Sequence, residues 1–160
     1  MNGLLQKLGL VPFFTQQLAD ATLLQERLGR VMTVQRSRST VACDAGERAV
    51  ELTPALRRKV AIDRPTVGDW VILDESLSRI EKILERKSLF KRLGAGESNE
   101  LQPIAANIDT LFIVTSCNEE FKESRLERYL ALCTEAGAMP VIVLTRADLA
   151  EDTDSYVRRA

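Results

Sequence analysis

The sequence has no histidine and only three cysteines, Cys43, Cys117 and Cys133. The cysteines are scattered along the chain, and no two of them form a Cys-x-x-Cys pair. Zinc sites are built mainly from cysteine and histidine at short spacings, and disulfide frameworks need several paired cysteines. We therefore expect no metal site and no disulfide framework in this chain, and we expect a reducing, cytoplasmic location.

Long apolar runs are missing as well. No segment approaches the roughly 20 apolar residues that a membrane-spanning helix needs. The start of the chain carries a single lysine, Lys7, and no long apolar core, which argues against a secretory signal. The hydrophobic fraction of 45% and the charged fraction of 28% are usual for a folded soluble protein. We expect a monomer that does not bind membranes.

Positive and negative side chains are nearly equal in number, but they are unevenly distributed along the chain. The formal net charge is -1. Residues 22–102 contain 15 basic and 12 acidic side chains, whereas residues 103–160 contain 6 basic and 10 acidic ones. A basic part joined to an acidic part indicates that only the first part meets a polyanion.

The first half of the chain is typical of a small β-barrel. After a lead-in segment at residues 1–28, short stretches rich in β-branched residues alternate with turn-forming residues. The expected strands are residues 29–36, 39–44, 48–52, 69–74 and 78–84. Five short strands at this spacing predict an OB-fold barrel over residues 29–85. A small SH3-like barrel is the alternative that periodicity does not separate from it.

The second half predicts a different architecture. Residues 86–102 have no sustained period and contain several glycines, so we expect a linker. Beyond it, residues 110–115 and 141–144 are continuous apolar runs, which is typical of strands covered on both faces. Between these runs, apolar residues recur at helical spacing, with Ser124 suited to capping the helix and Gly137 to ending it. Residues 103–160 thus predict one βαβ unit, the incomplete start of a larger parallel sheet.

A polar tetrapeptide, Thr145-Arg146-Ala147-Asp148, follows directly on the second apolar run. Ligands of open parallel sheets bind beyond the carboxyl ends of the strands. The carboxylate of Asp148 can accept hydrogen bonds from N1–H and the exocyclic amine of guanine, a donor pair that adenine lacks. The stem of Arg146 can lie along the base, and Thr145 can brace the loop through its hydroxyl. The alternative is that Asp148 caps the following helix.

Three segments resemble the RsgA/YjeQ family of ribosome small-subunit-dependent GTPases: residues 102–114, 125–130 and 140–148. The resemblance extends over residues 29–149 and is densest from Gln102 onward. It implies an N-terminal OB-fold followed by a circularly permuted P-loop GTPase domain, in which the guanine motif precedes the phosphate loop. The tetrapeptide then takes the place of the family's Asn-Lys-x-Asp motif, with Thr145 in place of asparagine and Arg146 in place of lysine.

The sequence contains no phosphate-binding Gly-x-x-x-x-Gly-Lys-Ser/Thr loop and no Asp-x-x-Gly segment for the γ-phosphate. Phosphoryl transfer needs positioned phosphates, a metal and an oriented water, so no catalytic residue is expected here. The resemblance implies GTP or GDP with Mg²⁺ in the complete protein and zinc in a further C-terminal domain. We expect neither to be bound by this chain, which we interpret as the N-terminal part of the protein and as inactive alone.

The resemblance also implies binding to small-subunit ribosomal RNA through the OB-fold, in a GTP-hydrolysing factor for late maturation of the 30S subunit. OB-folds bind nucleic acid through basic and aromatic side chains. Aromatic residues are few here, and Trp70 fits the core better than a stacking surface. The rival interpretation is a standalone OB-type RNA-binding module without enzymatic activity. The candidate RNA contacts are Arg36, Arg38, Arg57, Arg58, Lys59, Arg86, Lys87, Lys91 and Arg92.

Overall fold

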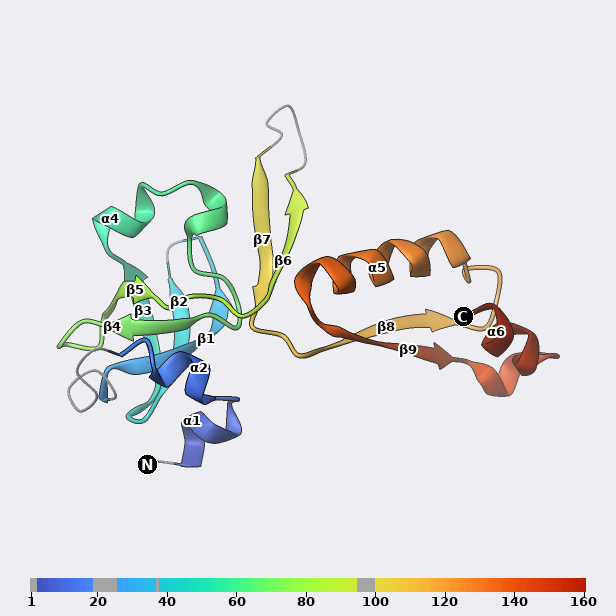
Figure 1. Ribbon diagram of the computed structural model, residues 1–160, viewed down its shortest axis with the longest axis horizontal. Coiled ribbons are helices and arrows are strands. Elements are labelled where there is room, and N and C mark those ends of the chain that lie inside the picture. The colour runs from blue at the N-terminus through green and yellow to red at the C-terminus, as the bar shows by residue number, and fades with distance from the viewer. Residues whose placement is uncertain (1–2, 19–25, 37, 95–99) are drawn as a thin grey trace. The chain divides into compact units, whose positions relative to one another are not determined.

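The computed structural model describes residues 3–18, 26–36, 38–94 and 100–160 (Figure 1). The chain divides into two compact units, which we call the barrel unit, Met1–Asn107, and the sheet unit, Ile108–Ala160. Parts of the expected lead-in and of the expected linker lie outside the described residues.

The barrel unit contains the five strands expected from the sequence. These strands are β1 (Leu28–Val34), β2 (Ser39–Cys43), β3 (Gly46–Leu52), β4 (Trp70–Leu73) and β5 (Arg79–Ile83). They close into a barrel in the order β1-β2-β3-β5-β4, with an antiparallel β1–β4 pair and a parallel β3–β5 pair. This is a five-stranded Greek-key barrel rather than a simple meander, and it confirms the predicted OB-fold.

Two apolar clusters stabilise the barrel unit. The interior is filled by alternating strand residues such as Val31, Val41 and Ile80, each at most 1% exposed. The second cluster covers one end of the barrel, where Trp70 packs against Phe14 with ring centroids 5.6 Å apart. Phe14 belongs to α2 (Pro12–Thr15), which follows α1 (Gly3–Lys7). The lead-in is therefore part of the barrel's packing, and Trp70 is a core residue.

A helical segment and a hairpin complete the barrel unit. The segment between β3 and β4 forms α4 (Pro54–Arg57) and the 3-10 turn η1 (Ala61–Asp63). The hairpin pairs β6 (Leu89–Leu93) with β7 (Leu101–Ala106) (Figure 1).

The hairpin corrects the expected linker at residues 86–102, because β6 and the start of β7 lie inside it. The backbone N–H of Ala106 donates to the carbonyl of Val67 at 2.8 Å, which ties β7 to the barrel. The division between the units falls after Asn107, a few residues later than the expected boundary at 103. Apolar periodicity missed the hairpin because, of its strand residues, only Phe90 and Ala106 are buried.

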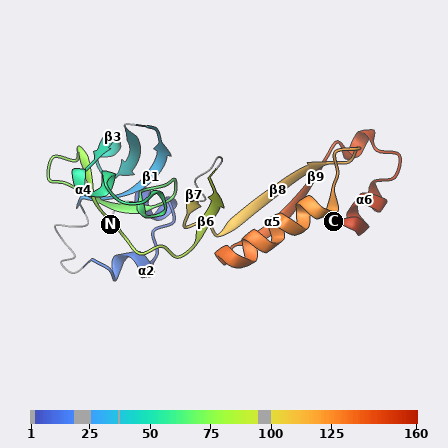
Figure 2. The ribbon, with the colours of Figure 1, turned by 90° about the horizontal axis from the view of Figure 1, so that it is seen from above.

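The sheet unit is the predicted βαβ unit. Strands β8 (Thr110–Ser116) and β9 (Met139–Thr145) pair in parallel, and α5 (Glu123–Ala136) connects them. Helix α5 runs along the strand pair (Figure 2) and ends at Gly137, whose φ of 71° fits a left-handed cap. The helix begins one residue before Ser124, whose side chain does not cap it.

Among the residues that the structure describes, one face of the β8–β9 sheet is covered and the other is exposed. Ile113 is 5% exposed, whereas its neighbours Phe112 and Val114, which point to the opposite face of the strand, are each 64% exposed. The apolar run predicted cover on both faces, and the second face is open here. After β9 the chain forms the 3-10 turn η2 (Ala147–Leu149) and α6 (Thr153–Arg159). No helix among the described residues combines the length and apolarity needed to cross a membrane.

Candidate functional site

The tetrapeptide after β9 forms an exposed loop at the carboxyl end of the parallel pair. Thr145 is the last residue of β9, and its Oγ1 donates to the carbonyl of Thr115 on β8 at 3.1 Å. The backbone N–H of Cys117 donates to the carbonyl of Thr145 at 2.9 Å. Arg146 then turns the chain in a left-handed conformation, with φ 56° and ψ 31°. These bonds fix the point at which the loop leaves the sheet.

The carboxylate of Asp148 is exposed and forms no hydrogen bond or ion pair within the part of the chain that the structure describes. It lies in η2, so the alternative role as a helix cap is wrong. The cap of α6 is Asp152, whose Oδ1 accepts from the N–H of Ser155 at 3.0 Å. Because local structure does not use Asp148, its oxygens are available to a ligand.

A polar hollow of about 230 Å³ lies at the carboxyl ends of β8 and β9. Asn118 holds two of its lining residues, since its Oδ1 accepts from Ser116 Oγ at 2.9 Å and from the N–H of Glu120 at 3.0 Å. Sequence reasoning did not select this loop, although its place directly after an apolar strand was a usable signal. Lining residues are Val114, Thr115, Ser116, Glu120, Arg125, Thr145 and Arg146.

In the barrel unit, three of the predicted RNA contacts line one cavity of about 310 Å³. Arg36 and Arg38 flank the turn between β1 and β2, and Arg57 ends α4. A fourth arginine, Arg64, joins them from the segment before β4. No sequence pattern singled out Arg64, because only the fold brings residues 64 and 36 together. We call this feature the arginine cavity.

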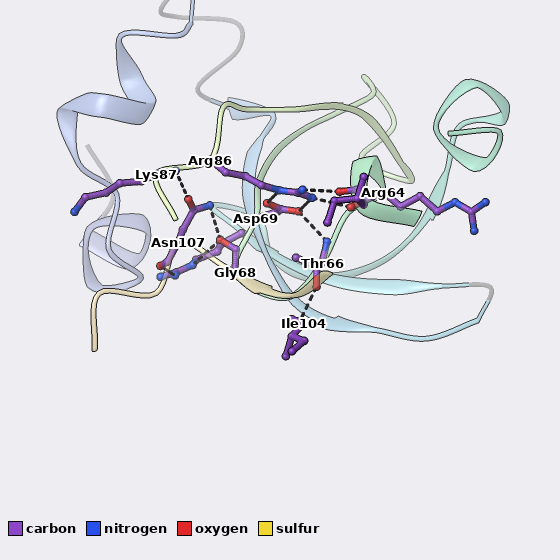
Figure 3. Close-up of polar contacts among 10 residues, drawn as sticks. Arg64, Thr66, Gly68, Asp69, Arg86, Lys87, Ile104 and Asn107 are labelled. Carbon is purple, nitrogen blue, oxygen red and sulfur yellow. Dashed lines mark hydrogen bonds and ion pairs between the residues drawn. The ribbon is translucent and has the colours of Figure 1, made fainter. Parts of the chain in front are cut away.

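Arg86 pairs with a buried carboxylate. Its guanidinium forms a bidentate pair with Asp69, with Nε–Oδ1 and Nη2–Oδ2 distances of 2.8 Å (Figure 3). It also donates to the carbonyls of Ile62 and Arg64, both at 2.7 Å. The Arg86 side chain is 16% exposed and that of Asp69 is 0% exposed. The expected RNA contact stays a prediction, and the donors of Arg86 already serve a buried carboxylate and backbone carbonyls of the chain.

The remaining basic candidates do not gather at the arginine cavity. Arg58 and Lys59 are exposed beside α4, and Arg92 is exposed on β6. Lys87 and Lys91 take part in interactions within the chain. The structure therefore concentrates Arg36, Arg38 and Arg57 and spreads the others over the barrel unit.

No group of three or more cysteine, aspartate or glutamate residues that could hold a metal ion occurs among the described residues. Neither the polar hollow nor the loop at Asp148 thus offers a protein-made metal site. Mg²⁺ prefers oxygen donors, and the described residues do not provide an acidic ligand set for it.

Comparisons with known proteins agree with the fold described for each of the two units. Residues 83–160 match the model of the RsgA GTPase family. The chain is 45% identical over 150 residues to the small ribosomal subunit biogenesis GTPase RsgA 2 of Vibrio parahaemolyticus, covering 94% of this chain and 40% of that protein. It is 41% identical over 158 residues to the small ribosomal subunit biogenesis GTPase RsgA of Mesorhizobium japonicum, covering 98% of this chain and 43% of that protein.

Two solved structures have a similar fold. The crystal structure of YjeQ from Thermotoga maritima superposes with a TM-score of 0.60 at 22% identity, covering 83% of this chain and 46% of that one. YloQ, described as a circularly permuted GTPase, superposes with a TM-score of 0.56 at 24% identity, covering 82% of this chain and 45% of that one. The chain spans less than half the length of these relatives.

Proposed function

Because the chain belongs to the RsgA GTPase family, we propose that it is part of a GTP-hydrolysing factor for late maturation of the small ribosomal subunit. The observation that carries this proposal is the exposed, unpaired carboxylate of Asp148 in the loop after β9, inside the region that matches the family. In the complete protein, GTP would hold the factor on the subunit and hydrolysis would release it.

The loop supports recognition of guanine through the side chains of Asp148 and Arg146, with Thr145 bracing the loop. The carboxylate of Asp148 would accept hydrogen bonds from N1–H and the exocyclic amine of the base. The stem of Arg146 would lie along the base face. Thr145 does not reach for the base: its hydroxyl is bonded to Thr115, which keeps the end of β9 in register with β8.

The phosphate chemistry belongs to groups that these residues do not supply. Magnesium, when bound with the nucleotide, neutralises charge that develops on the transferred phosphoryl group. Backbone amides and a lysine of a phosphate loop usually hold the phosphates, and the sequence contains no such loop. The chain's own contribution is therefore selection of the base.

The barrel unit supports binding of ribosomal RNA. The arginine cavity gathers positive charge on the surface of an OB-fold, and such barrels bind nucleic acid through basic grooves. Phosphate contacts position a protein on RNA without reading its sequence. The barrel would thus anchor the factor on the subunit while the second unit binds nucleotide.

Replacing Asp148 with asparagine in the full-length protein tests the assignment of the base site. An amide presents a donor where the carboxylate presents only acceptors, so the preference should move from guanine toward xanthine, whose C2 oxygen accepts. Each hydrogen bond to a charged acceptor contributes roughly 1.5–3 kcal/mol, so GTP affinity should fall at least about tenfold. Calorimetry with GTP, XTP and ATP measures the change.

Asp152→Asn is the matched control, because Asp152 lies four residues away but caps α6. It should leave the base preference unchanged. If the Asp148→Asn protein prefers GTP over XTP and ATP by the same factor as the wild type, Asp148 is not part of the base site.

A further inference from the structure

We propose that the arginine cavity binds one unpaired nucleotide of RNA, with its phosphate group held among the four guanidinium groups. The inference rests on the proposed RNA-binding function and assigns it to one cavity of the barrel unit. Its occupant is a phosphodiester with an attached base that is not in a helix.

The cavity gathers positive charge from segments far apart in the sequence. Arg36 and Arg38 come from the β1–β2 turn, Arg57 from α4, and Arg64 from the segment that leads to β4. Guanidinium groups recognise phosphate through parallel hydrogen bonds as well as charge. Four such groups around one cavity make a phosphate the favoured occupant over a neutral ligand.

Most of these guanidinium groups have donors to spare. Arg36 and Arg38 are exposed and form no side-chain hydrogen bond within the described part of the chain. Arg64 uses only its Nε, which donates to the carbonyl of Lys59 at 2.8 Å.

Counting only described residues, Arg57 is the one member of the set with a carboxylate partner. Its Nη2 lies 2.9 Å from Oε2 of Glu51, in a pair whose side chains are 54% and 45% exposed. Exposed pairs of this kind contribute only about 0–1 kcal/mol. A phosphate can therefore compete with Glu51 for Arg57.

The size and the apolar part of the lining favour a nucleotide over a bare anion. A volume of about 310 Å³ is at the low end for pockets that hold small ligands, and it is too small for a duplex. Val34, Leu52 and Pro65 supply apolar surface beside the arginines. Unstacked bases of RNA commonly rest on arginine planes as well as on aromatic rings, so a base has a surface to lie on.

One wall of the cavity is held in place before any ligand arrives. Arg86 donates to the carbonyls of Ile62 and Arg64, and the carboxylate of Asp69 accepts from the N–H of Thr66 at 2.8 Å (Figure 3). The buried Asp69–Arg86 pair therefore fixes the backbone that carries Arg64 and Pro65. A preformed wall reduces the entropy lost on binding.

The test uses the full-length protein and fluorescence anisotropy with a labelled single-stranded RNA of about 12 nucleotides, a length within the range that an OB-fold covers. The double variant Arg36→Lys/Arg64→Lys keeps the charge but removes two planar guanidinium groups. We expect it to lose about fivefold or more in affinity for the single strand and much less for a duplex of the same sequence. Arg48→Lys/Arg79→Lys, at exposed barrel positions outside the cavity, should bind as the wild type does.

Three outcomes would overturn the proposal in distinguishable ways. Wild-type binding that falls with salt between about 50 and 200 mM, but is unchanged in the cavity variant, would refute the cavity and keep the RNA-binding function. Wild-type protein that binds neither single-stranded RNA nor small subunits would refute that function itself. The third outcome is that millimolar inorganic phosphate displaces the RNA and that the cavity variant loses equal affinity for duplex and single strand. That outcome would identify a general anion site instead.

Discussion

At the scale of single residues, Asp69 carries a fully buried carboxylate whose charge is balanced by Arg86. Removing one partner of a buried ion pair typically costs about 3–5 kcal/mol, since the other charge is left without compensation. Substitution of Arg86 should therefore affect folding before RNA binding. Variants of the exposed Arg36 and Arg38 are the cleaner probes of the surface.

Asp74 gives a prediction about pH. Partial burial acts to raise the pKa of its carboxyl group, but hydrogen bonds from Ser78, Ser76 and the N–H of Arg79 outweigh this, so the pKa is lowered in the folded state. The folded state then binds fewer protons than the unfolded state near the pKa of an ordinary aspartate. The stabilisation is present above that pKa and is lost as the pH falls through the lowered value.

We expect Asp74→Asn to be less stable than the wild type at neutral pH by on the order of 1 kcal/mol. The difference should begin to shrink below about pH 4, where the unfolded chain starts to bind a proton at Asp74, and it should shrink further as the pH falls through the lowered pKa of the folded state. Urea denaturation at a series of pH values measures it. A difference that stays constant down to the acid limit would mean that the charge of Asp74 contributes nothing.

At the scale of elements, the approach of β7 to the barrel depends on Gly68. Its φ is 88°, and a Cβ atom there would lie 2.0 Å from the carbonyl oxygen of Ala106. Its own carbonyl accepts from Arg30 Nε at 3.3 Å and from Asn107 Nδ2 at 3.1 Å. A side chain at this position would therefore push away the strand that these bonds hold.

Gly46 is the matched control, because its φ is 92° but a Cβ atom would meet nothing within 4 Å. We expect Gly46→Ala to cost only the backbone strain of about 1–2 kcal/mol and Gly68→Ala to cost at least about 3 kcal/mol, since β7 must also move. Urea denaturation followed by the fluorescence of Trp70, the only tryptophan, measures both. If both variants lose the same free energy of unfolding, displacement of β7 has no energetic cost.

At the scale of the whole molecule, the chain contains the loop that we propose to recognise guanine, but its sequence contains no phosphate-loop motif. Two hydrogen bonds from Asp148 at roughly 1.5–3 kcal/mol each must offset the entropy lost on association, which leaves about millimolar affinity or weaker. We expect no saturable binding at micromolar GTP and no GTPase activity for residues 1–160. Calorimetry and a phosphate-release assay measure this, with the full-length protein as the positive control. Micromolar binding by this chain would mean that phosphate-binding groups lie within it.

The sequence by itself determined the five barrel strands and the βαβ elements of the sheet unit. Short alternating stretches predicted all five barrel strands, and apolar runs separated by a helical period predicted β8, α5 and β9. Both patterns are local, because the side-chain periods of strand and helix are set by the backbone. The position of Thr145, Arg146 and Asp148 was predictable for the same reason, since a loop that follows an apolar strand lies at the edge of the sheet. Their role in guanine binding stays a proposal.

Only the tertiary structure decided which charges face solvent and which lie together. Sequence patterns do not distinguish Arg86 from Arg36. In the fold, however, Arg86 pairs with Asp69, whereas Arg36 and Arg64 line the same cavity. The hairpin of β6 and β7 was also hidden, because its stabilising contacts, such as Ala106 to Val67, link residues distant in sequence. A charge is assigned to a pair or to a surface by the partners that the fold brings within hydrogen-bond distance, and the spacing of residues along the chain does not contain that information.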